Sequence, residues 1–264
     1  MTAATQLSIL IPVYNERRLL PHLLQKVHSV LPELRREIIL VDDCSTDGTR
    51  EWLREHFGTG GVITGFTKDA DGAPQPILAP SEPAGANQAP VQAMAVFHAQ
   101  NQGKGAALRT ALRVARGDVI VIQDADLEYD PNDLPSMWRL INEGHADVVY
   151  GSRFYGNPHR CLYFHHFMAN KLISYLFSLL YNQILTDLEV CYKMFRREVR
   201  DLLTLRSNDF GFEIEFSANV ARAKRLRIYE IGISYYGRSY AEGKKINWRD
   251  GLKALWYIFR FRFT

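Results

Sequence analysis

Two carboxylates stand one residue apart at Asp124 and Asp126, directly after the β-branched run at 119–122. Such a run is typical of a short buried strand. In extended backbone, residues i and i+2 point to the same side, so both carboxylates can offer oxygen ligands to one Mg²⁺ or Mn²⁺ ion. A cation held this way keeps open positions, which phosphate oxygens commonly fill. The competing interpretation is that the two Asp residues only open a turn before Pro131.

Short apolar runs alternate with helical patterns along the first 150 residues. Strands are predicted at 7–13, 37–41, 94–97, 119–122 and 147–150. Helices are predicted near 19–30, around Trp52 and Leu53, at 106–115 and near 134–142. We expect Asn15 to cap the first helix, and Asp47 or Ser45 to cap the second. The alternation predicts a doubly wound α/β fold, with a Rossmann-like, mostly parallel sheet and helices on both faces.

Five polar turns follow the predicted strands. They contain residues 12–16, Asp42 with Asp43, residues 101–105, Asp124 with Asp126, and Ser152 with Arg153. Parallel topology places the carboxyl ends of all strands at one edge, where ligands bind in open α/β sheets.

Lys104 lies between two glycines at a predicted helix N-terminus, which suits an anion, although no Walker Lys-Ser/Thr pair follows. Together these turns predict a pocket for a nucleoside diphosphate and a metal.

Residues 58–90 show no sustained period and are rich in Gly and Pro. We interpret them as a loop insertion or a locally disordered segment that the fold can dispense with. We expect the whole chain, 1–264, to form one domain, with 58–90 as an insertion and an acceptor-side and C-terminal region at 162–264.

Composition excludes few classes of function. A net charge of +3 is too small to indicate nucleic acid, and it suits an acidic ligand or an anionic membrane face equally well. The three cysteines are widely spaced, which favours reduced thiols in a cytoplasmic protein. No uncharged apolar run reaches the ~18 residues that a membrane span needs, and the N-terminus shows no signal pattern.

Two aromatic stretches leave the membrane question open. Residues 162–184 predict either a core helix or an interfacial helix, and 248–263 mix aromatic residues with arginines, as at a membrane surface or in a helix folded onto the domain. We therefore expect a cytoplasmic protein that can be peripheral at the inner face of the cell membrane.

The motifs together resemble family 2 glycosyltransferases with the GT-A fold. The segments that carry the resemblance are 11–16, 41–49, 101–105, 124–126, 151–153, 186–197, 210–215 and 237–246. Their order and spacing are most similar to the polyprenyl-phosphate, dolichol-phosphate mannose synthase-like branch. The resemblance covers nearly the whole chain except 58–90.

The resemblance implies roles on the donor side. Pro12, Tyr14 and Glu16 would border the nucleobase pocket, and Asp42 or its neighbour Asp43 would bind the base. Asp124 and Asp126, with Gln123, would hold Mg²⁺ or Mn²⁺ on the diphosphate of a UDP- or GDP-sugar. Lys104 would join them as a contact of the nucleotide sugar.

On the acceptor side, the resemblance implies that Arg153 and Arg238 are anion contacts and that Asp187 lies near the acceptor. Val190-Cys191 replaces the Ser-Gly pair that the family more often has, which alters the fine geometry there. Asp126, Arg153 and Asp187 would form the catalytic set.

The expected reaction is an inverting, in-line transfer, with a metal that neutralises the leaving diphosphate. A polyprenyl phosphate acceptor arrives ionised, whereas a hydroxyl acceptor would require Asp187 as a general base. The alternatives are a saccharide or small-molecule hydroxyl acceptor, a sugar-nucleotide nucleotidyltransferase, a receiver-like signalling module, and a non-catalytic binder of nucleotide sugars.

Overall fold

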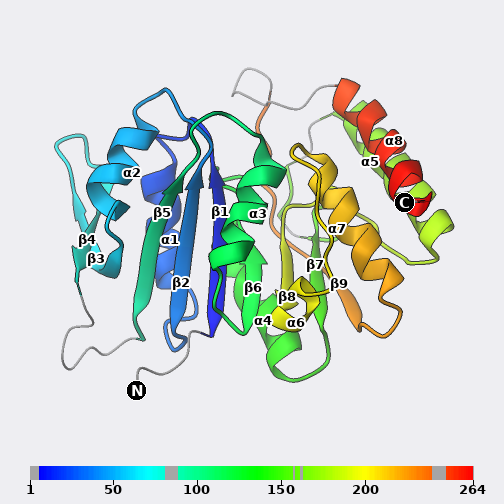
Figure 1. The fold of residues 1–264 in the computed structure, drawn as a ribbon, viewed down its shortest axis with the longest axis horizontal. Helices are drawn as coiled ribbons and strands as arrows, with labels where there is room; N and C mark the ends of the chain where they lie inside the picture. Colours follow the sequence, from blue (N-terminus) through cyan, green and yellow to red (C-terminus); the bar gives the residue numbers. More distant parts are fainter. Residues whose placement is uncertain (1–5, 81–88, 157, 161–162, 240–247, 264) are drawn as a thin grey trace. The chain divides into compact units, whose positions relative to one another are not determined.

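The computed structural model describes residues 6–80, 89–156, 158–160, 163–239 and 248–263 (Figure 1). The chain forms two compact units, Met1–Leu127 and Glu128–Thr264. The single domain over 1–264, with an acceptor-side and C-terminal region at 162–264, stays a prediction.

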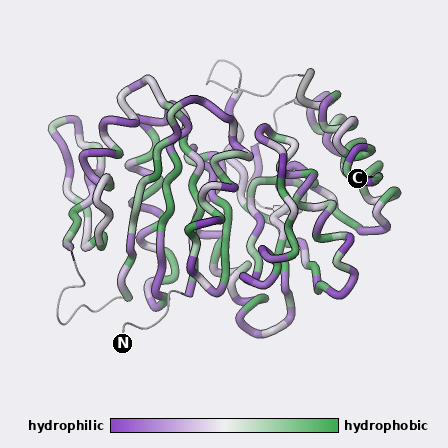
Figure 2. Tube along the Cα trace, viewed as in Figure 1, coloured by the Kyte–Doolittle hydropathy of each residue, from purple (hydrophilic) through white to green (hydrophobic). Residues whose placement is uncertain are grey.

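The first unit is built on four parallel strands, β1 (Leu7–Val13), β2 (Arg36–Asp42), β5 (Val91–Phe97) and β6 (Val119–Ile122). They lie in the order β5-β2-β1-β6. β2 and β6 are buried at every residue, as expected for parallel strands covered on both faces. Figure 2 shows hydrophobic stretches along these strands. Four predicted strands are therefore confirmed.

Three helices of the first unit connect these strands: α1 (Leu20–Ser29), α2 (Thr49–Phe57) and α3 (Lys104–Val114). Pro21 lies in the first turn of α1, where its missing N–H has no intrahelical partner. The predicted cap at Asn15 is wrong: α1 begins after Leu19, with no side-chain cap. Gly48 takes the N-cap position of α2, and Asp47 accepts a hydrogen bond from the Thr49 amide.

The predicted loop at 58–90 is wrong over its first two thirds. Residues Gly61–Lys68 form β3 and Pro74–Ala79 form β4, an antiparallel hairpin that extends the sheet beyond β5. Val62 and Ile63 of β3 are buried, and the Trp52 indole N–H donates to the Gln75 side chain at 2.8 Å. Residues 81–88 lie outside the described part.

The second unit contains three strands, β7 (Val148–Ser152), β8 (Lys193–Arg196) and β9 (Ile228–Gly232). β7 lies between the other two, antiparallel to β8 and parallel to β9. The predicted strand at 147–150 is confirmed as β7. The strands β8 and β9 were not predicted from the sequence.

The helical elements of the second unit are η1 (Pro131–Asp133), α4 (Leu134–Asn142), α5 (Phe164–Tyr181), α6 (Arg197–Arg200), α7 (Gly211–Arg222) and α8 (Trp248–Phe263). The α4 prediction is confirmed. α5 and α8 lie side by side, and the Tyr181 hydroxyl donates to the Ile258 carbonyl at 3.1 Å (Figure 1).

The hairpin supplies a stability test with a matched pair of residues. Ile63 is 3% exposed in β3, whereas Ile77 is 47% exposed in β4. We expect Ile63→Ala to lower the free energy of unfolding by about 2–5 kcal/mol, because a buried side chain leaves a cavity. Ile77→Ala is expected to change it by less than about 1 kcal/mol. Urea unfolding measures both; equal effects would show that the hairpin does not pack as part of the core.

Candidate functional site

The turn after β1 is hydrogen-bonded to the turn after β2. Asn15 has a left-handed backbone (φ +55°), its amide donates to Ser45 Oγ at 2.9 Å, and its Oδ1 accepts from the Thr46 amide at 2.8 Å. The neighbouring Tyr14 is 40% exposed. Two of the predicted nucleobase residues, Tyr14 and Glu16, thus lie in a turn with a fixed backbone.

Asp42 and Pro12 lie at the ends of β2 and β1, where the strands leave the sheet. The Asp42 carboxylate is fully buried; its Oδ2 accepts from Arg50 Nε at 2.6 Å and its Oδ1 from the Ser45 amide at 3.2 Å. Pro12 pairs with Val41 in the parallel ladder and is half-buried. The Asp42 side chain therefore joins the strand end to α2.

Asp43 joins the turn after β2 to the turn after β5. Its Oδ1 accepts from His98 Nδ1 at 2.7 Å and from the Gln102 amide at 2.9 Å, and its Oδ2 accepts from the Gly103 amide at 2.6 Å. The carboxylate is buried. Of the two candidates for a base contact, Asp43 is thus the residue that fixes the loop before Lys104.

Lys104 in turn pairs with the turn after β6. Its ammonium lies 2.7 Å from Asp124 Oδ1, and both side chains keep partial access to solvent. Asp126 is half-buried, whereas the Gln123 side chain is fully buried and its Nε2 donates to the Asp124 carbonyl at 3.1 Å. Four of the five predicted turns are thus linked in series along one edge of β5-β2-β1-β6.

The carboxylates at this edge can hold a hard divalent cation in an open coordination arrangement. Within the described residues, no group of three or more His, Cys, Asp or Glu side chains could enclose a metal. Asp124 and Asp126 supply two oxygen-bearing groups, which is the open arrangement that leaves positions for phosphate oxygens. Lys104 would compete with the cation for Asp124, since both are positively charged.

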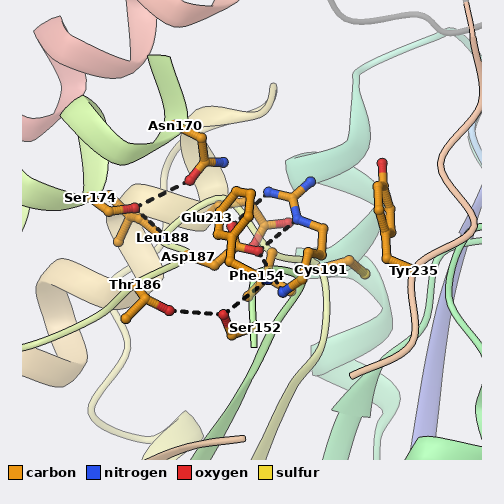
Figure 3. Close-up of polar contacts among 12 residues, drawn as sticks. Ser152, Phe154, Asn170, Ser174, Thr186, Asp187, Leu188, Cys191, Glu213 and Tyr235 are labelled. Carbon is orange, nitrogen blue, oxygen red and sulfur yellow. Dashed lines mark hydrogen bonds and ion pairs between the residues drawn. The ribbon is translucent and has the colours of Figure 1, made fainter. Parts of the chain in front are cut away.

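The fifth turn belongs to the second unit, where Arg153 and Asp187 form a bidentate ion pair. Arg153 Nε and Nη2 donate to Asp187 Oδ2 and Oδ1 at 2.7 and 2.6 Å, and the Arg153 amide donates to Oδ2 at 3.0 Å. Burial alone would lower the pKa of Arg153, but the charge of Asp187 outweighs it and raises that pKa above its ordinary value. Phe154 and Tyr235 lie on opposite sides of the pair (Figure 3).

Close backbone packing holds the turn that carries Arg153. A Cβ at Gly156 would overlap the Ile233 carbonyl, and one at Gly232 would overlap the backbone of Tyr155. Ser152 also bonds Thr186 through their hydroxyls at 2.8 Å (Figure 3). The turn after β7 is therefore held against both β9 and the segment before Asp187.

Arg238, the other predicted anion contact, pairs with a residue that sequence analysis missed. Its amide and Nε donate to Glu128 Oε1 at 2.8 and 3.1 Å, and the Tyr235 hydroxyl donates to Glu128 Oε2 at 2.9 Å. The sequence signal was available, because Glu128 stands two residues after Asp126.

Glu189 is a second residue that sequence reasoning missed. It lies two positions after Asp187 and is half-buried. Burial raises its pKa to about 7, against the lowering effect of Arg153, and Asp187 adds to the rise. Only its place within 186–197 marked it in the sequence. A carboxyl that titrates near neutrality is unusual, and such groups cluster at functional sites.

Comparison with known proteins identifies a family model. The model described as "Glycosyl transferase family 2" matches residues 8–72 and 88–203. The undecaprenyl-phosphate mannosyltransferase of Micrococcus luteus is 28% identical over 247 residues, covering 89% of this chain and 85% of that protein. The undecaprenyl-phosphate 4-deoxy-4-formamido-L-arabinose transferase of Pseudomonas syringae is 33% identical over 144 residues. That match covers 54% of this chain and 34% of the Pseudomonas protein, so the chain matches only about a third of that relative.

Solved structures support the fold. Glucosyl-3-phosphoglycerate synthase from Mycobacterium tuberculosis, in complex with UDP, superposes with a TM-score of 0.66 at 17% identity, covering 98% of this chain and 80% of that one. The same synthase with Mn²⁺, UDP and phosphoglyceric acid gives a TM-score of 0.65. At such identity the likeness shows the fold alone, and it confirms the predicted GT-A class.

The raised pKa of Glu189 predicts a dependence of stability on pH. Between its ordinary pKa of 4.5 and its folded value of about 7, the folded protein retains a proton that the unfolded chain has lost. Stability should therefore fall as pH rises through this window. We expect Glu189→Gln to make that fall shallower and the exposed control Glu198→Gln to leave it unchanged. Urea midpoints at pH 4.5 and 7.5 measure it; parallel profiles for wild type and Glu189→Gln would contradict the assignment.

Proposed function

Because the chain belongs to glycosyl transferase family 2, we propose that it is an inverting enzyme that moves a sugar from a UDP- or GDP-sugar to a polyprenyl phosphate. The observation that carries the proposal is the series of hydrogen-bonded turns at the carboxyl edge of β1, β2, β5 and β6, which ends at Lys104 and Asp124. A nucleoside diphosphate needs a cation, backbone donors and a metal-binding carboxylate, and this edge offers all three.

Lys104 and the two carboxylates act on the donor diphosphate. Asp124 and Asp126 would hold Mg²⁺ or Mn²⁺, which would supply positive charge to the leaving nucleoside diphosphate. Lys104, at the first turn of α3, pairs with Asp124 and would be positioned to bind a phosphate oxygen of the donor. Tyr14 offers an exposed ring to the nucleobase, beside Pro12, Glu16 and Asp42.

Asp187 acts through Arg153 rather than as a base. Both of its oxygens already accept from the Arg153 guanidinium, and the carboxylate is fully buried. A phosphate acceptor does not need a base, because its second pKa of ~6 leaves it largely ionised at pH 7. We therefore assign Asp187 to holding Arg153 in place. Arg153 and Arg238 are assigned to binding anionic groups on the acceptor side.

The acceptor class rests on the relatives and on an exposed surface. The Micrococcus and Pseudomonas relatives are named as transferases to undecaprenyl phosphate. Within the described residues, no helix is both long and apolar enough to cross a bilayer. α5 and α8 nevertheless each expose an apolar stripe at helical spacing, made of Phe164, Met168, Leu172, Tyr175 and Leu179, and of Leu252, Trp256, Phe259 and Phe263.

These stripes fit a membrane surface. Exposed aromatic residues suit the headgroup region, and Lys253, Arg260 and Arg262 add positive charge to α8. The Arg260 guanidinium lies 4.8 Å from the centre of the Trp256 ring, so apolar and cationic groups adjoin. A lipid acceptor would reach the enzyme from such a surface.

The metal assignment predicts the outcome of one substitution. Asp126→Ala should lower turnover of the nucleotide sugar by at least about a hundredfold, because the cation loses a ligand and the leaving group loses its charge partner. The control is Asp118→Ala, at the opposite end of β6 and exposed. Donor hydrolysis and transfer are measured across UDP- and GDP-sugars with Mn²⁺ and with EDTA. Normal turnover of Asp126→Ala in EDTA would refute the metal site.

The membrane assignment predicts a binding defect without a folding defect. We expect the double variant Leu172→Ser/Trp256→Ser to float with anionic liposomes several-fold less than wild type, since both side chains are more than half exposed. Its Tm should stay within a few degrees of wild type. Ile77→Ser, an exposed apolar residue of the first unit, is the control. Equal flotation of the three proteins would refute the surface.

A further inference from the structure

Lys171 of α5 has an unusual environment within the second unit. Its ammonium lies 4.4 Å from the centre of the Phe154 ring, 5.6 Å from that of Phe167 and 5.7 Å from that of Tyr155. It donates one hydrogen bond, to the Thr186 carbonyl at 3.4 Å. Three aromatic side chains and a carbonyl thus surround one cation.

Lys171 differs from three other cations of the second unit in having no carboxylate partner among the described residues. Arg153 is paired with Asp187, Arg238 with Glu128, and the buried Lys193 with Glu213. Among the described residues, no carboxylate lies within ion-pair distance of the Lys171 ammonium. Aromatic faces attract a cation through their quadrupole, but they carry no net charge and leave the ammonium charge in place. An anion can therefore be bound there.

The position of Lys171 relates it to the acceptor side. Thr186, which accepts its hydrogen bond, immediately precedes Asp187. The Phe154 ring is shared, because the Arg153 guanidinium carbon lies 5.9 Å from the same ring centre. Lys171 is thus next to the Arg153–Asp187 pair without being part of it.

Lys171 also borders the exposed apolar stripe of α5. Met168 and Leu172 flank it along the helix, and both are about half exposed. Phe167, one of its aromatic partners, is 40% exposed. A ligand that joins a phosphate to a hydrocarbon chain would meet a cation and an apolar surface on the same helix.

We propose that Lys171 binds the phosphate monoester of the acceptor while the exposed apolar residues of α5 contact its hydrocarbon. The inference rests on the proposed function and assigns a specific residue to its acceptor site. A phosphate monoester carries about −1.5 to −2 charges at pH 7, so a cation without a carboxylate partner is the appropriate ligand.

The nearby acidic groups oppose this binding only weakly. Asp187 is neutralised by Arg153. Burial raises the pKa of Glu189 to about 7, so a large part of it is uncharged at neutral pH. Burial also raises the pKa of Glu230, whose carboxylate accepts from the amides of Thr186 and Asp187.

The test is equilibrium binding by calorimetry, with farnesyl phosphate, farnesol and glycerol 3-phosphate as probes. We expect Lys171→Gln to weaken farnesyl phosphate binding by about tenfold or more, since the variant loses a charge-assisted hydrogen bond to the phosphate. Farnesol binding should stay unchanged, and Lys171→Arg should retain most of the affinity because it keeps the charge. Lys224→Gln, at an exposed lysine after α7 that lies outside both apolar stripes, is the control and should bind farnesyl phosphate like the wild type.

Three outcomes would overturn the inference: unchanged affinity of Lys171→Gln for farnesyl phosphate, an equal loss for farnesol, or no preference of the wild type for the phosphate over the alcohol. Glycerol 3-phosphate binding as tight as that of farnesyl phosphate would overturn the lipid part and identify a soluble phosphate monoester.

Transfer kinetics separate this inference from the proposed function. If both hold, Lys171→Gln raises the KM for polyprenyl phosphate and leaves the KM for the nucleotide sugar unchanged. If the wild type transfers sugar to polyprenyl phosphate and Lys171→Gln keeps its acceptor KM, only the inference fails. If farnesyl phosphate binds through Lys171 but no UDP- or GDP-sugar is turned over, only the proposed function fails.

Discussion

The buried carboxylate of Asp43 is the interaction on which the donor edge of the first unit depends. It accepts hydrogen bonds from His98 and from two backbone amides of the following turn. A buried carboxylate without partners would be costly, so the turn must stay where its amides can reach it. The position of Lys104, one residue after Gly103, follows from that constraint, and with it the pairing to Asp124. The buried Asp43 carboxylate thus positions the Lys104 ammonium at the donor edge.

The second unit uses charge differently. Its arginines at 153 and 238 are each held by a carboxylate that accepts from both the backbone amide and the guanidinium of the same residue. Such pairing fixes the direction of each guanidinium, and the opposite charges of the pair cancel. Most of the favourable Coulomb energy of a buried pair only offsets the cost of its desolvation. Binding a dianion there requires additional charge that is not already compensated. An anion site is therefore indicated by which cations lack a carboxylate partner, rather than by the number of cations.

Sequence reasoning succeeded where one physical rule dominates and failed where several compete. The strand β6 is apolar throughout, β1 is interrupted only by Ser8, and β2 has a central apolar run at 38–41. Their parallel order follows from the helices between them. The β3–β4 hairpin was not predicted because a register irregularity between Ile63 and Gly65 breaks the alternation of apolar and polar residues. Its prolines also resemble loop residues. The turn after a predicted strand marked Asp43, and the family resemblance implied Asp187 and Arg238. Their partners His98, Arg153 and Glu128 come from distant positions or other turns. Pairing of that kind depends on tertiary structure and has no local pattern.

The prolines of β4 have a consequence for the behaviour of the protein in solution. β4 is the last strand on its side of the sheet, and Pro74 and Pro76 alternate along it. A proline has no N–H, so an edge strand with two of them offers an approaching strand an incomplete row of donors. Exposed edges otherwise template the joining of one sheet to another. The added hairpin therefore extends the sheet and at the same time ends it, which protects a concentrated protein against edge-to-edge aggregation.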